Sequence, residues 1–273
     1  MTAILYRPQP PLSKFVEVIW MFEGHVPQHR RERILPTGVM QLVINLHQED
    51  LRIYDRQHPD RYQSFGSGLL SGAHSEYIVI DTSPQAAVIG VHFKPGGAFP
   101  LLKMPADELQ DTAVSLETLW RIHASVLREQ LLAAATPLLK VRLLEHFLLA
   151  QAARPWERHP AVAFALKAFT GESLIRPISE ITDQIGLSSR RFIQVFKQET
   201  GFTPKVFCRI QRFQKVLSAI GMNQDIDWVE LALECGYFDQ AHFIHDFRAF
   251  SGLSPSTYLA QRTAHTNHVP LVE

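Results

Sequence analysis

The segment 231–243, with the sequence LALECGYFDQAHF, carries the strongest structural signal in the chain. Gly236 follows a short helical pattern, and glycine readily adopts the left-handed backbone conformation that ends a helix. Asp239 stands where an N-cap belongs, because its side-chain oxygen can accept the free amide protons of the next helix. Phe243 and Phe247 lie four residues apart and therefore on one face of that helix. The segment predicts two short helices joined by a glycine turn.

The same pattern occurs once before in the chain. The earlier copy contains Ile181, Gly186, Ser188, Phe192, Phe196, Gly201 and Pro204, and the later one contains Leu231, Gly236, Asp239, Phe243, Phe247, Gly252 and Pro255. The offset is 50 residues up to the turn glycine and 51 after it, so the later turn has one extra residue. Each copy has the features of a helix-turn-helix unit. A single unit is common in helical domains that never contact DNA, whereas two copies favour DNA binding.

A helical stretch from 203 to about 220 separates the two copies. Its 18 residues, at 1.5 Å each, form a rod about 27 Å long. A rod of this length is predicted to hold two reading helices near one DNA turn, about 34 Å, apart. The outer faces of those helices carry side-chain types that bond base edges and phosphates: Arg190, Gln194 and Lys197 in the first copy, and Gln240, His245 and Arg248 in the second.

Residues 161–262 resemble the DNA-binding domain of the AraC/XylS family of bacterial transcription regulators. The resemblance is carried by segment 231–243 together with Phe247-Arg248, Gly252 and Ser254-Pro255, and the whole domain covers about a third of the chain. The first copy matches more loosely, because Thr182 stands where the family usually has the alanine that Ala232 supplies in the second copy. The resemblance implies a sequence-specific regulator that binds double-stranded DNA, with RNA polymerase as a partner if it activates transcription.

The same resemblance assigns roles by motif position. Bases would be read by Ser189, Arg190, Ile193 and Gln194 in the first unit and by Gln240, Ala241, Ile244 and His245 in the second. Phosphates would be contacted by Arg191, Lys197, Arg209, Arg212, His242 and Arg248. Arg190 suits guanine and Gln240 suits adenine, each through two hydrogen bonds. For any single residue, a solvated side chain on a helix face is the alternative.

Local charge distinguishes the two units, although the whole chain has 27 basic and 27 acidic residues. From 176 to 215 there are eight basic and three acidic residues, a net charge of +5. From 216 to 262 there are two basic and six acidic residues, a net charge of −4. Neutralisation of phosphates supplies much of the affinity for DNA. We therefore predict that the first unit anchors the complex and that the second adds weaker, sequence-dependent contacts.

Residues 1–105 are predicted to form a mostly β domain. β-branched runs at 39–46, 76–80 and 86–93 are bounded by glycine and proline turns, which is typical of a sandwich or small barrel. The stretches 35–38 (LPTG) and 90–97 (GVHFKPGG) resemble the sensor halves of some AraC/XylS members. An effector pocket inside this domain would be lined by Trp20, Phe22, Gln41, Asn45 and His92, selected only as polar or aromatic residues on predicted strands.

The rest of the chain connects these parts. Helices predicted within 106–153 carry a stripe of Leu116, Leu119, Leu127 and Leu131, which is either a homodimer surface or ordinary core. Two prolines interrupt the pattern at 154–160, which we interpret as an interdomain linker, and we expect residues 263–273 to be a frayed tail. The predicted fold class is α+β in two domains, the second all-α with two helix-turn-helix units.

Other classes of protein find little support. The thirteen histidines include no His-X-His pair, and no cysteine or carboxylate pattern completes a zinc site around His242 and His245. Neither a nucleophile elbow nor a phosphate loop occurs, so we predict no enzyme, cofactor or metal. No apolar run reaches the roughly 18 residues of a membrane span, and no secretory signal is visible. Two cysteines, Cys208 and Cys235, fit a reducing cytoplasm.

The leading hypothesis is a cytoplasmic transcription regulator whose first domain senses an effector. One alternative is a constitutive or partner-regulated DNA-binding protein whose first half only oligomerises or binds protein. A small-molecule enzyme with a regulatory tail is the third reading, and it predicts turnover where the others predict none.

Overall fold

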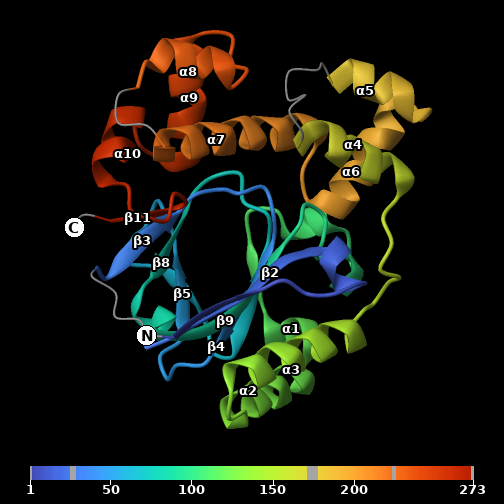
Figure 1. Cartoon of the computed structure of the whole chain (residues 1–273), viewed down its shortest axis with the longest axis vertical. Helices are drawn as coiled ribbons and strands as arrows, with labels where there is room; N and C mark the ends of the chain where they lie inside the picture. Colours follow the sequence, from blue (N-terminus) through green and yellow to red (C-terminus); the bar gives the residue numbers. More distant parts are fainter. Residues whose placement is uncertain (1, 25–28, 171–177, 223–225, 272–273) are drawn as a thin grey trace.

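Two antiparallel sheets make up the β domain of the computed structural model, which describes residues 2–24, 29–170, 178–222 and 226–271 (Figure 1). The first sheet has the strand order β1 (Thr2–Tyr6), β2 (Val16–Glu23), β9 (Ala87–Phe93), β4 (Gln41–Asn45), β7 (Gly68–Ser71), β10 (Ala113–Ser115). The second has the order β11 (His268–Pro270), β3 (Arg31–Ile34), β8 (Ile78–Asp81), β5 (Leu51–Tyr54), β6 (Tyr62–Phe65). The predicted architecture, a mostly β half followed by helices, is confirmed.

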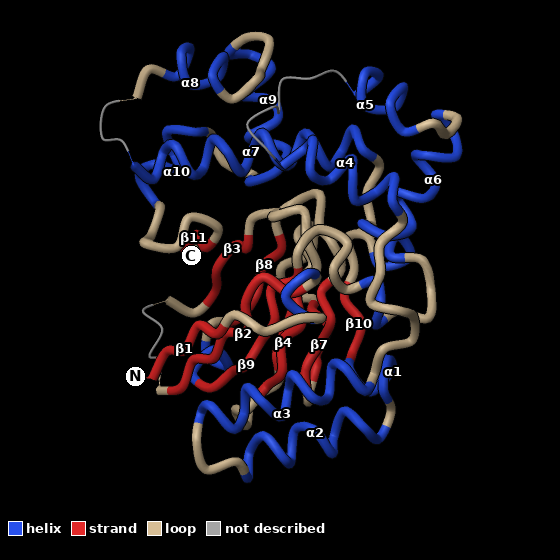
Figure 2. The backbone as a smooth tube through the Cα atoms, turned by 45° about the vertical axis from the view of Figure 1, so that its right-hand side comes forward, coloured by secondary structure: helices blue, strands red, loops and turns tan. Residues whose placement is uncertain are grey.

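Side-chain alternation along β2 decides which layer each residue joins. Ile19 and Met21 are fully buried in the large core, whereas Trp20 and Phe22 pack on a small separate core of Leu51, Phe65, Leu69 and Val88. Because successive side chains of a strand point to opposite faces, the two pairs lie on opposite sides of the sheet. Figure 2 shows helices α2 and α3 covering one face of this sheet.

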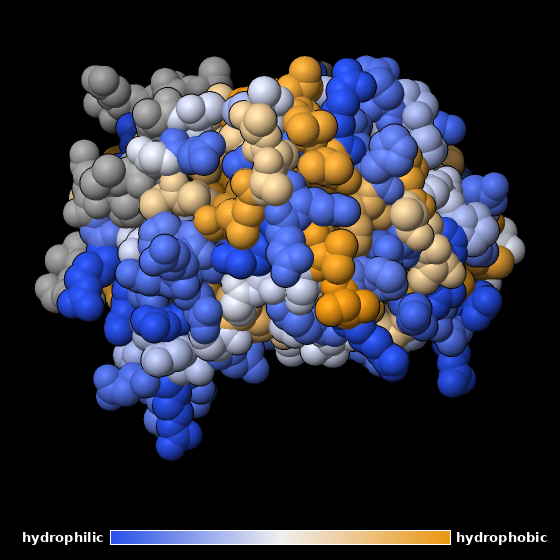
Figure 3. Space-filling model, turned by 90° about the horizontal axis from the view of Figure 1, so that it is seen from below, coloured by the Kyte–Doolittle hydropathy of each residue, from blue (hydrophilic) through white to orange (hydrophobic). Residues whose placement is uncertain are grey.

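Three helices follow the β domain: α1 (Leu116–Trp120), α2 (Ile122–Ala133) and α3 (Pro137–Ala150). The predicted stripe belongs to the core, since Leu116, Leu127 and Leu131 are buried and Leu119 is half-buried. It therefore packs the helices onto the sheet and offers no dimer surface. Other apolar side chains of the hairpin are exposed instead: Ile122, Val126, Leu132, Leu138, Leu139 and Leu149. Figure 3 shows an apolar band on the underside of the molecule, the side on which Figure 1 places α2 and α3.

The C-terminal half of the described chain is helical as far as Gln261. Its helices are α4 (Pro160–Thr170), α5 (Ile178–Ile185), α6 (Ser189–Thr200), α7 (Pro204–Met222), α8 (Trp228–Glu234), α9 (Gln240–Ser251) and α10 (Pro255–Gln261). Helix α7 has 19 residues and is therefore about 28 Å long. In Figure 1 it lies across the top of the β domain, with α5 and α6 toward one end and α8 and α9 toward the other.

The expectation of a frayed tail is wrong for the described part of it. Residues 268–270 form strand β11, which pairs antiparallel with β3 of the β domain. Val269 is fully buried there, and the Tyr258 hydroxyl donates a hydrogen bond to the Thr266 carbonyl at 2.8 Å. Burial of an apolar side chain and strand hydrogen bonds hold the segment, and neither is visible in its polar sequence.

Candidate nucleic-acid interface

The first helix-turn-helix unit consists of α5 and α6. Gly186 lies between them with φ +72° and has no heavy atom within 4 Å of the position where a Cβ would stand. It is therefore the left-handed backbone, and not a lack of space, that favours glycine at this turn. The Ser188 hydroxyl accepts a hydrogen bond from the Arg191 amide and caps α6, and Gly201 ends α6 in the left-handed conformation.

The second unit, α8 and α9, repeats this geometry. The Asp239 carboxylate accepts a hydrogen bond from the His242 amide at 2.7 Å, and Gly236 has φ +82°. Asp227 caps α8 by accepting hydrogen bonds from the amides of Val229 and Glu230, at 2.8 and 3.1 Å. Both units therefore have the caps and turns that their sequences predict.

Aromatic packing fixes the second helix of each unit, α6 or α9, on α7; we call these two the recognition helices. In the first unit the ring of Phe196 lies 5.7 Å from those of Phe192 and Phe207, and in the second Phe247 lies 5.2 Å from Phe213. Thr182, the departure from the family pattern, is buried, and its hydroxyl donates to the Ile178 carbonyl at 2.9 Å. The threonine is thus accommodated by a hydrogen bond within α5.

The residues assigned to bases lie on the free faces of α6 and α9. Ser189, Arg190, Ile193 and Gln194 are exposed on α6, and Gln240, Ala241 and His245 are exposed on α9, where Ile244 is half-buried. All eight belong to the N-terminal halves of the two helices. The N-terminal part of a recognition helix is the part that contacts base edges in the major groove.

The residues assigned to phosphates have more varied surroundings. Arg248 is exposed, and Arg191 is exposed with its guanidinium donating to Gln194 Oε1 at 2.9 Å. Lys197 forms an ion pair with Asp107 of the β domain at 2.9 Å. Arg212 lies over the ring of Tyr237, 5.3 Å from its centre. Lys197 and Arg212 thus already have partners within the protein.

Arg209 is held by a buried carboxylate that the sequence did not single out. Its guanidinium donates to Asp246 Oδ1 at 2.6 Å and Oδ2 at 3.3 Å, and this hydrogen bonding raises the pKa of Arg209. Asp246 is buried on α9, with His242 Nε2 and His245 Nδ1 within 4 Å of its oxygens. The pair connects α7 to the recognition helix of the second unit.

This pairing changes the surface charge of both units. The net charge of the second unit includes Asp246, and that of the first includes Arg209. These two side chains neutralise each other in the folded protein. Without this pair the net charges of the two regions become +4 and −3, which keeps the predicted asymmetry. Spacing could have indicated Asp246, because it falls three residues after Phe243 and one before Phe247, on the buried side of α9.

The predicted effector residues share the face of the first sheet that is turned toward the second sheet. Gln41 pairs with His92 across β4 and β9, and the ring of Trp20 lies 5.7 Å from His92 and 5.5 Å from Phe22. All four of these side chains are half-buried. Burial, and to a smaller extent repulsion from His268, lowers the pKa of His92 to about 4. Its imidazole is therefore neutral at pH 7.

Asn45 has a structural role at the end of β4. Its amide donates hydrogen bonds to the carbonyls of Glu49 and Gly66, at 2.7 and 3.1 Å, and its oxygen accepts from the His47 amide. Ser71 and His74, which the sequence did not suggest, lie beside the predicted set: Ser71 pairs with Gln41 across strands, and its hydroxyl is 2.9 Å from His74 Nε2. Burial lowers the pKa of His74 to about 4.

The described residues form neither a metal site nor a membrane-spanning helix. No group of three or more histidine, cysteine, aspartate or glutamate side chains there is arranged to hold a metal ion. No helix in the same ranges is long and apolar enough to span a bilayer. Both cysteines are free thiols, and burial raises the pKa of Cys208 to about 12.

Comparison with known proteins gives separate matches for the two halves. Residues 5–115 match a family described as a domain of unknown function (DUF6597), and residues 181–261 match a helix-turn-helix domain family. An uncharacterised helix-turn-helix-type transcriptional regulator of Haemophilus influenzae is 32% identical over 81 residues, which are 30% of this chain and 27% of that protein. The chain thus matches about a quarter of that relative's length.

Among solved structures, ToxT from Vibrio cholerae bound to (E)-4-(8-methylnaphthalen-1-yl)but-3-enoic acid has a similar fold. The TM-score is 0.50 at 9% sequence identity, over 89% of this chain and 98% of the ToxT chain. At that identity the likeness concerns the fold. Together with the repeated caps, turns and exposed recognition faces, the matches identify residues 181–261 as a double helix-turn-helix domain of the AraC/XylS type.

Proposed function

We propose that this protein is a sequence-specific transcription regulator that binds double-stranded DNA through α6 and α9. The proposal is supported chiefly by two capped helices, α6 and α9, toward opposite ends of α7, on which the side chains assigned to base contacts are exposed, apart from the half-buried Ile244. The rod is about 28 Å long, close to the roughly 34 Å between successive major grooves on one face of DNA. The regulator acts in the cytoplasm, contacts RNA polymerase if it activates, and catalyses no reaction.

The first unit anchors the complex in this proposal. The basic excess from 176 to 215 favours phosphate contact, and Arg190 and Arg191 are exposed on α6. The second unit, with its acidic excess, contributes mainly base contacts through Gln240 and its neighbours. Arg209 acts as a positioning residue, because its guanidinium is engaged by the buried carboxylate of Asp246 at 2.6 Å.

An effector binds the β domain on the face that carries Trp20, Phe22, Gln41 and His92. This proposal is supported by their half-buried state and by the shared fold with ToxT, which has been crystallised with a small butenoic acid. A second candidate is supported by the exposed apolar side chains of α2 and α3, which suit an isologous dimer of this chain. In that case the first half of the protein could serve oligomerisation alone.

A genomic-library selection on the purified full-length protein tests the DNA-binding proposal. We expect enrichment of a site with two half-elements about one turn apart. Affinity for the best fragment is then followed against salt for the wild type, Arg190→Ala and Gln240→Ala. We expect Arg190→Ala to weaken binding more than Gln240→Ala does and to flatten the salt dependence more.

The outcomes test DNA binding and the anchoring role of the first unit separately. If no site is enriched and binding vanishes at moderate salt, the regulator proposal is wrong. Equal losses and equal salt slopes for the two variants would contradict the anchoring role of the first unit only. A metabolite panel that shifts the melting temperature of the full-length protein would support effector control, and concentration-dependent mass would support the oligomerisation candidate.

A further inference from the structure

The segment 263–271 extends from the DNA-binding domain onto the β domain. The Leu35 amide donates to the Asn267 carbonyl at 2.9 Å, and the Leu271 amide donates to the Arg31 carbonyl at 3.0 Å. Between them Pro270 faces Glu32 at a position where the ladder requires no N–H from it. The segment thus covers the edge of the second sheet and connects the last helix to it.

A glutamine of α7 joins both sides of this contact. Gln214 Nε2 lies 2.8 Å from the Pro36 carbonyl of the β domain and 2.8 Å from Asn267 Oδ1 of the segment. Gly38, close to Pro36, approaches the side chains of Gln211 and Ile210 on the same helix. The long helix that carries both reading units is therefore held against the β domain where segment 263–271 arrives.

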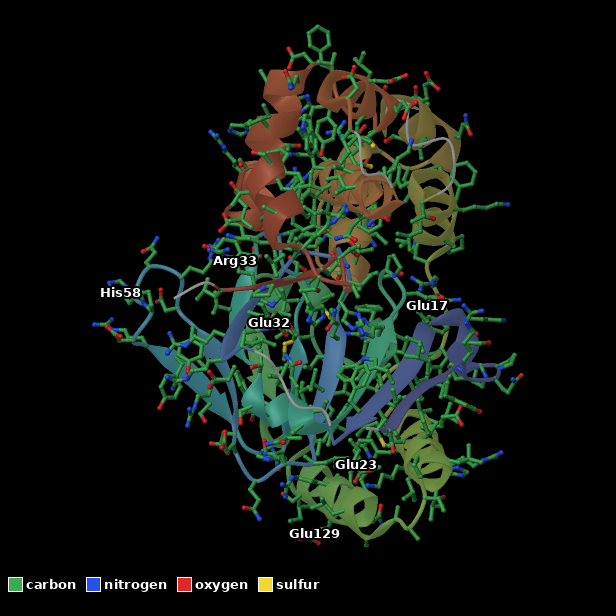
Figure 4. The ribbon with its side chains drawn as sticks, turned by 60° about the vertical axis from the view of Figure 1, so that its left-hand side comes forward. Glu17, Glu23, Glu32, Arg33, His58 and Glu129 are labelled. Atoms are coloured by element: carbon green, nitrogen blue, oxygen red, sulfur yellow. The ribbon has the colours of Figure 1, made fainter. Side chains whose placement is uncertain are left out.

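The segment is also attached through a buried carboxylate. Glu32 on β3 is buried, and its oxygens lie 3.0 Å from His268 Nδ1 and 3.2 Å from His29 Nε2, with Gln85 donating to it as well. Burial raises the pKa of Glu32, but these hydrogen bonds outweigh it and the net pKa lies below the usual value. Figure 4 shows Glu32 within the β domain beside the C-terminal strand, whereas Glu17 lies on the other side of the domain.

Docking of the two domains engages the C-terminal ends of both recognition helices. Asp107 forms its ion pair with Lys197 near the end of α6. The Tyr77 amide donates to the Phe250 carbonyl near the end of α9 at 3.0 Å, and the Tyr77 ring lies against Gly252. The N-terminal halves of the helices remain free, but their mutual position is fixed and the charge of Lys197 is neutralised.

We propose that segment 263–271 is a latch that holds the DNA-binding domain in a state of low DNA affinity. This inference rests on the proposed function. While the latch is paired with β3, Asp107 occupies Lys197, so one cation is withheld from the phosphate backbone. When the latch detaches, the reading units leave the β domain and Lys197 becomes available to DNA. Strand β11 has three residues and pairs only with β3 at the edge of its sheet, so it can detach without unfolding the elements before it.

Two variants of the full-length protein release the latched state by different routes. Asp107→Asn removes the competing carboxylate, and deletion of residues 263–273 removes the latch itself. We expect each to bind the selected DNA fragment at least threefold more tightly at physiological salt. The plot of log affinity against log salt should become steeper by about 0.9, the slope of one added phosphate contact. Glu17→Gln is the matched control, because it removes the same charge from a residue paired with Lys94, away from the latch.

A disulfide tests the opposite direction. Ile34 and His268 face each other in a pair without backbone hydrogen bonds between them, where Cα atoms lie about 4.5 Å apart. That spacing suits a disulfide, so Ile34→Cys with His268→Cys should cross-link the latch to β3. We expect the oxidised form to bind DNA no more tightly than the wild type and the reduced form, which lacks the His268–Glu32 contact, to bind at least threefold more tightly. Amide hydrogen exchange of residues 267–271 without DNA reports whether the latch is paired.

The outcomes distinguish this inference from the function on which it rests. If wild type, Asp107→Asn and the deletion bind with equal affinity and equal slope, the latch proposal is wrong while DNA binding stands. If the oxidised and reduced forms of the double-cysteine variant bind DNA with equal affinity, although hydrogen exchange shows that the strand is fixed only in the oxidised form, the proposal is also wrong. If none of these forms binds DNA, both the latch and the proposed function fail.

Discussion

At the scale of single residues, two half-buried histidines make the stability of the β domain depend on pH. The pKa values of His74 and His92 are each lowered to about 4, chiefly by burial, whereas both titrate near 6.5 in the unfolded chain. The unfolded state therefore binds more protons between pH 6.5 and 4, so stability is full above that window and is lost as pH falls through it. We expect about 2.5 kcal/mol of loss per histidine at pH 4.5.

Urea unfolding at pH 7 and 4.5 measures this effect. His92→Gln should reduce the pH dependence by about the share of one histidine, because glutamine carries no titrating group. His123→Gln, on the exposed face of α2, is the matched control and should leave the dependence unchanged. A wild type equally stable at both pH values would show that neither imidazole is kept neutral by the fold.

At the scale of elements, the Arg209–Asp246 pair links α9 to α7 in addition to the aromatic packing between them. Asp246→Asn leaves a guanidinium that is only partly solvated without its anion, and we expect a loss of about 2 kcal/mol in the free energy of unfolding. Chemical denaturation measures this loss, and a double-mutant cycle with Arg209→Gln isolates the coupling. Arg248→Ala, at an exposed residue of the same helix, should change stability by less than about 0.5 kcal/mol. If the effects of Asp246→Asn and Arg209→Gln on the free energy of unfolding are additive, the pairing is contradicted.

Elements whose signals are local could be predicted from the sequence, and those that depend on distant partners could not. Ser188, Gly186, Asp239 and Gly236 act within a few residues of their own position, so both helix-turn-helix units were predictable. Strand β11 exists only because β3, more than 230 residues earlier, offers an unpaired edge and Glu32. The partner of Lys197 is likewise an aspartate from the other domain. Both contacts join residues that are far apart in the chain, so no periodic pattern in the sequence indicates them.

At the scale of the whole molecule, the exposed apolar face of the α2–α3 hairpin predicts a dimer. Ile122 is 67% exposed and Leu138 52%, and Val126, Leu132, Leu139 and Leu149 are exposed as well. Glu129 on α2 and Arg142 on α3 are exposed at helical positions among these residues, so a two-fold partner can match each charge with its opposite. We expect sedimentation to give twice the 31.1 kDa of one chain at micromolar concentration.

Ile122→Glu with Leu139→Glu should return the protein to the mass of one chain, because it would place carboxylates within an apolar contact. Leu5→Glu is the control for an exposed leucine elsewhere, since Leu5 is 74% exposed on β1 and lies outside the hairpin. A dimer would also bring four reading helices to one DNA, so the double variant should lose affinity for a paired site but keep its affinity for a single one. A wild type that sediments as one chain at tens of micromolar would rule out this surface as a dimer contact and leave each molecule to bind DNA through its own two units.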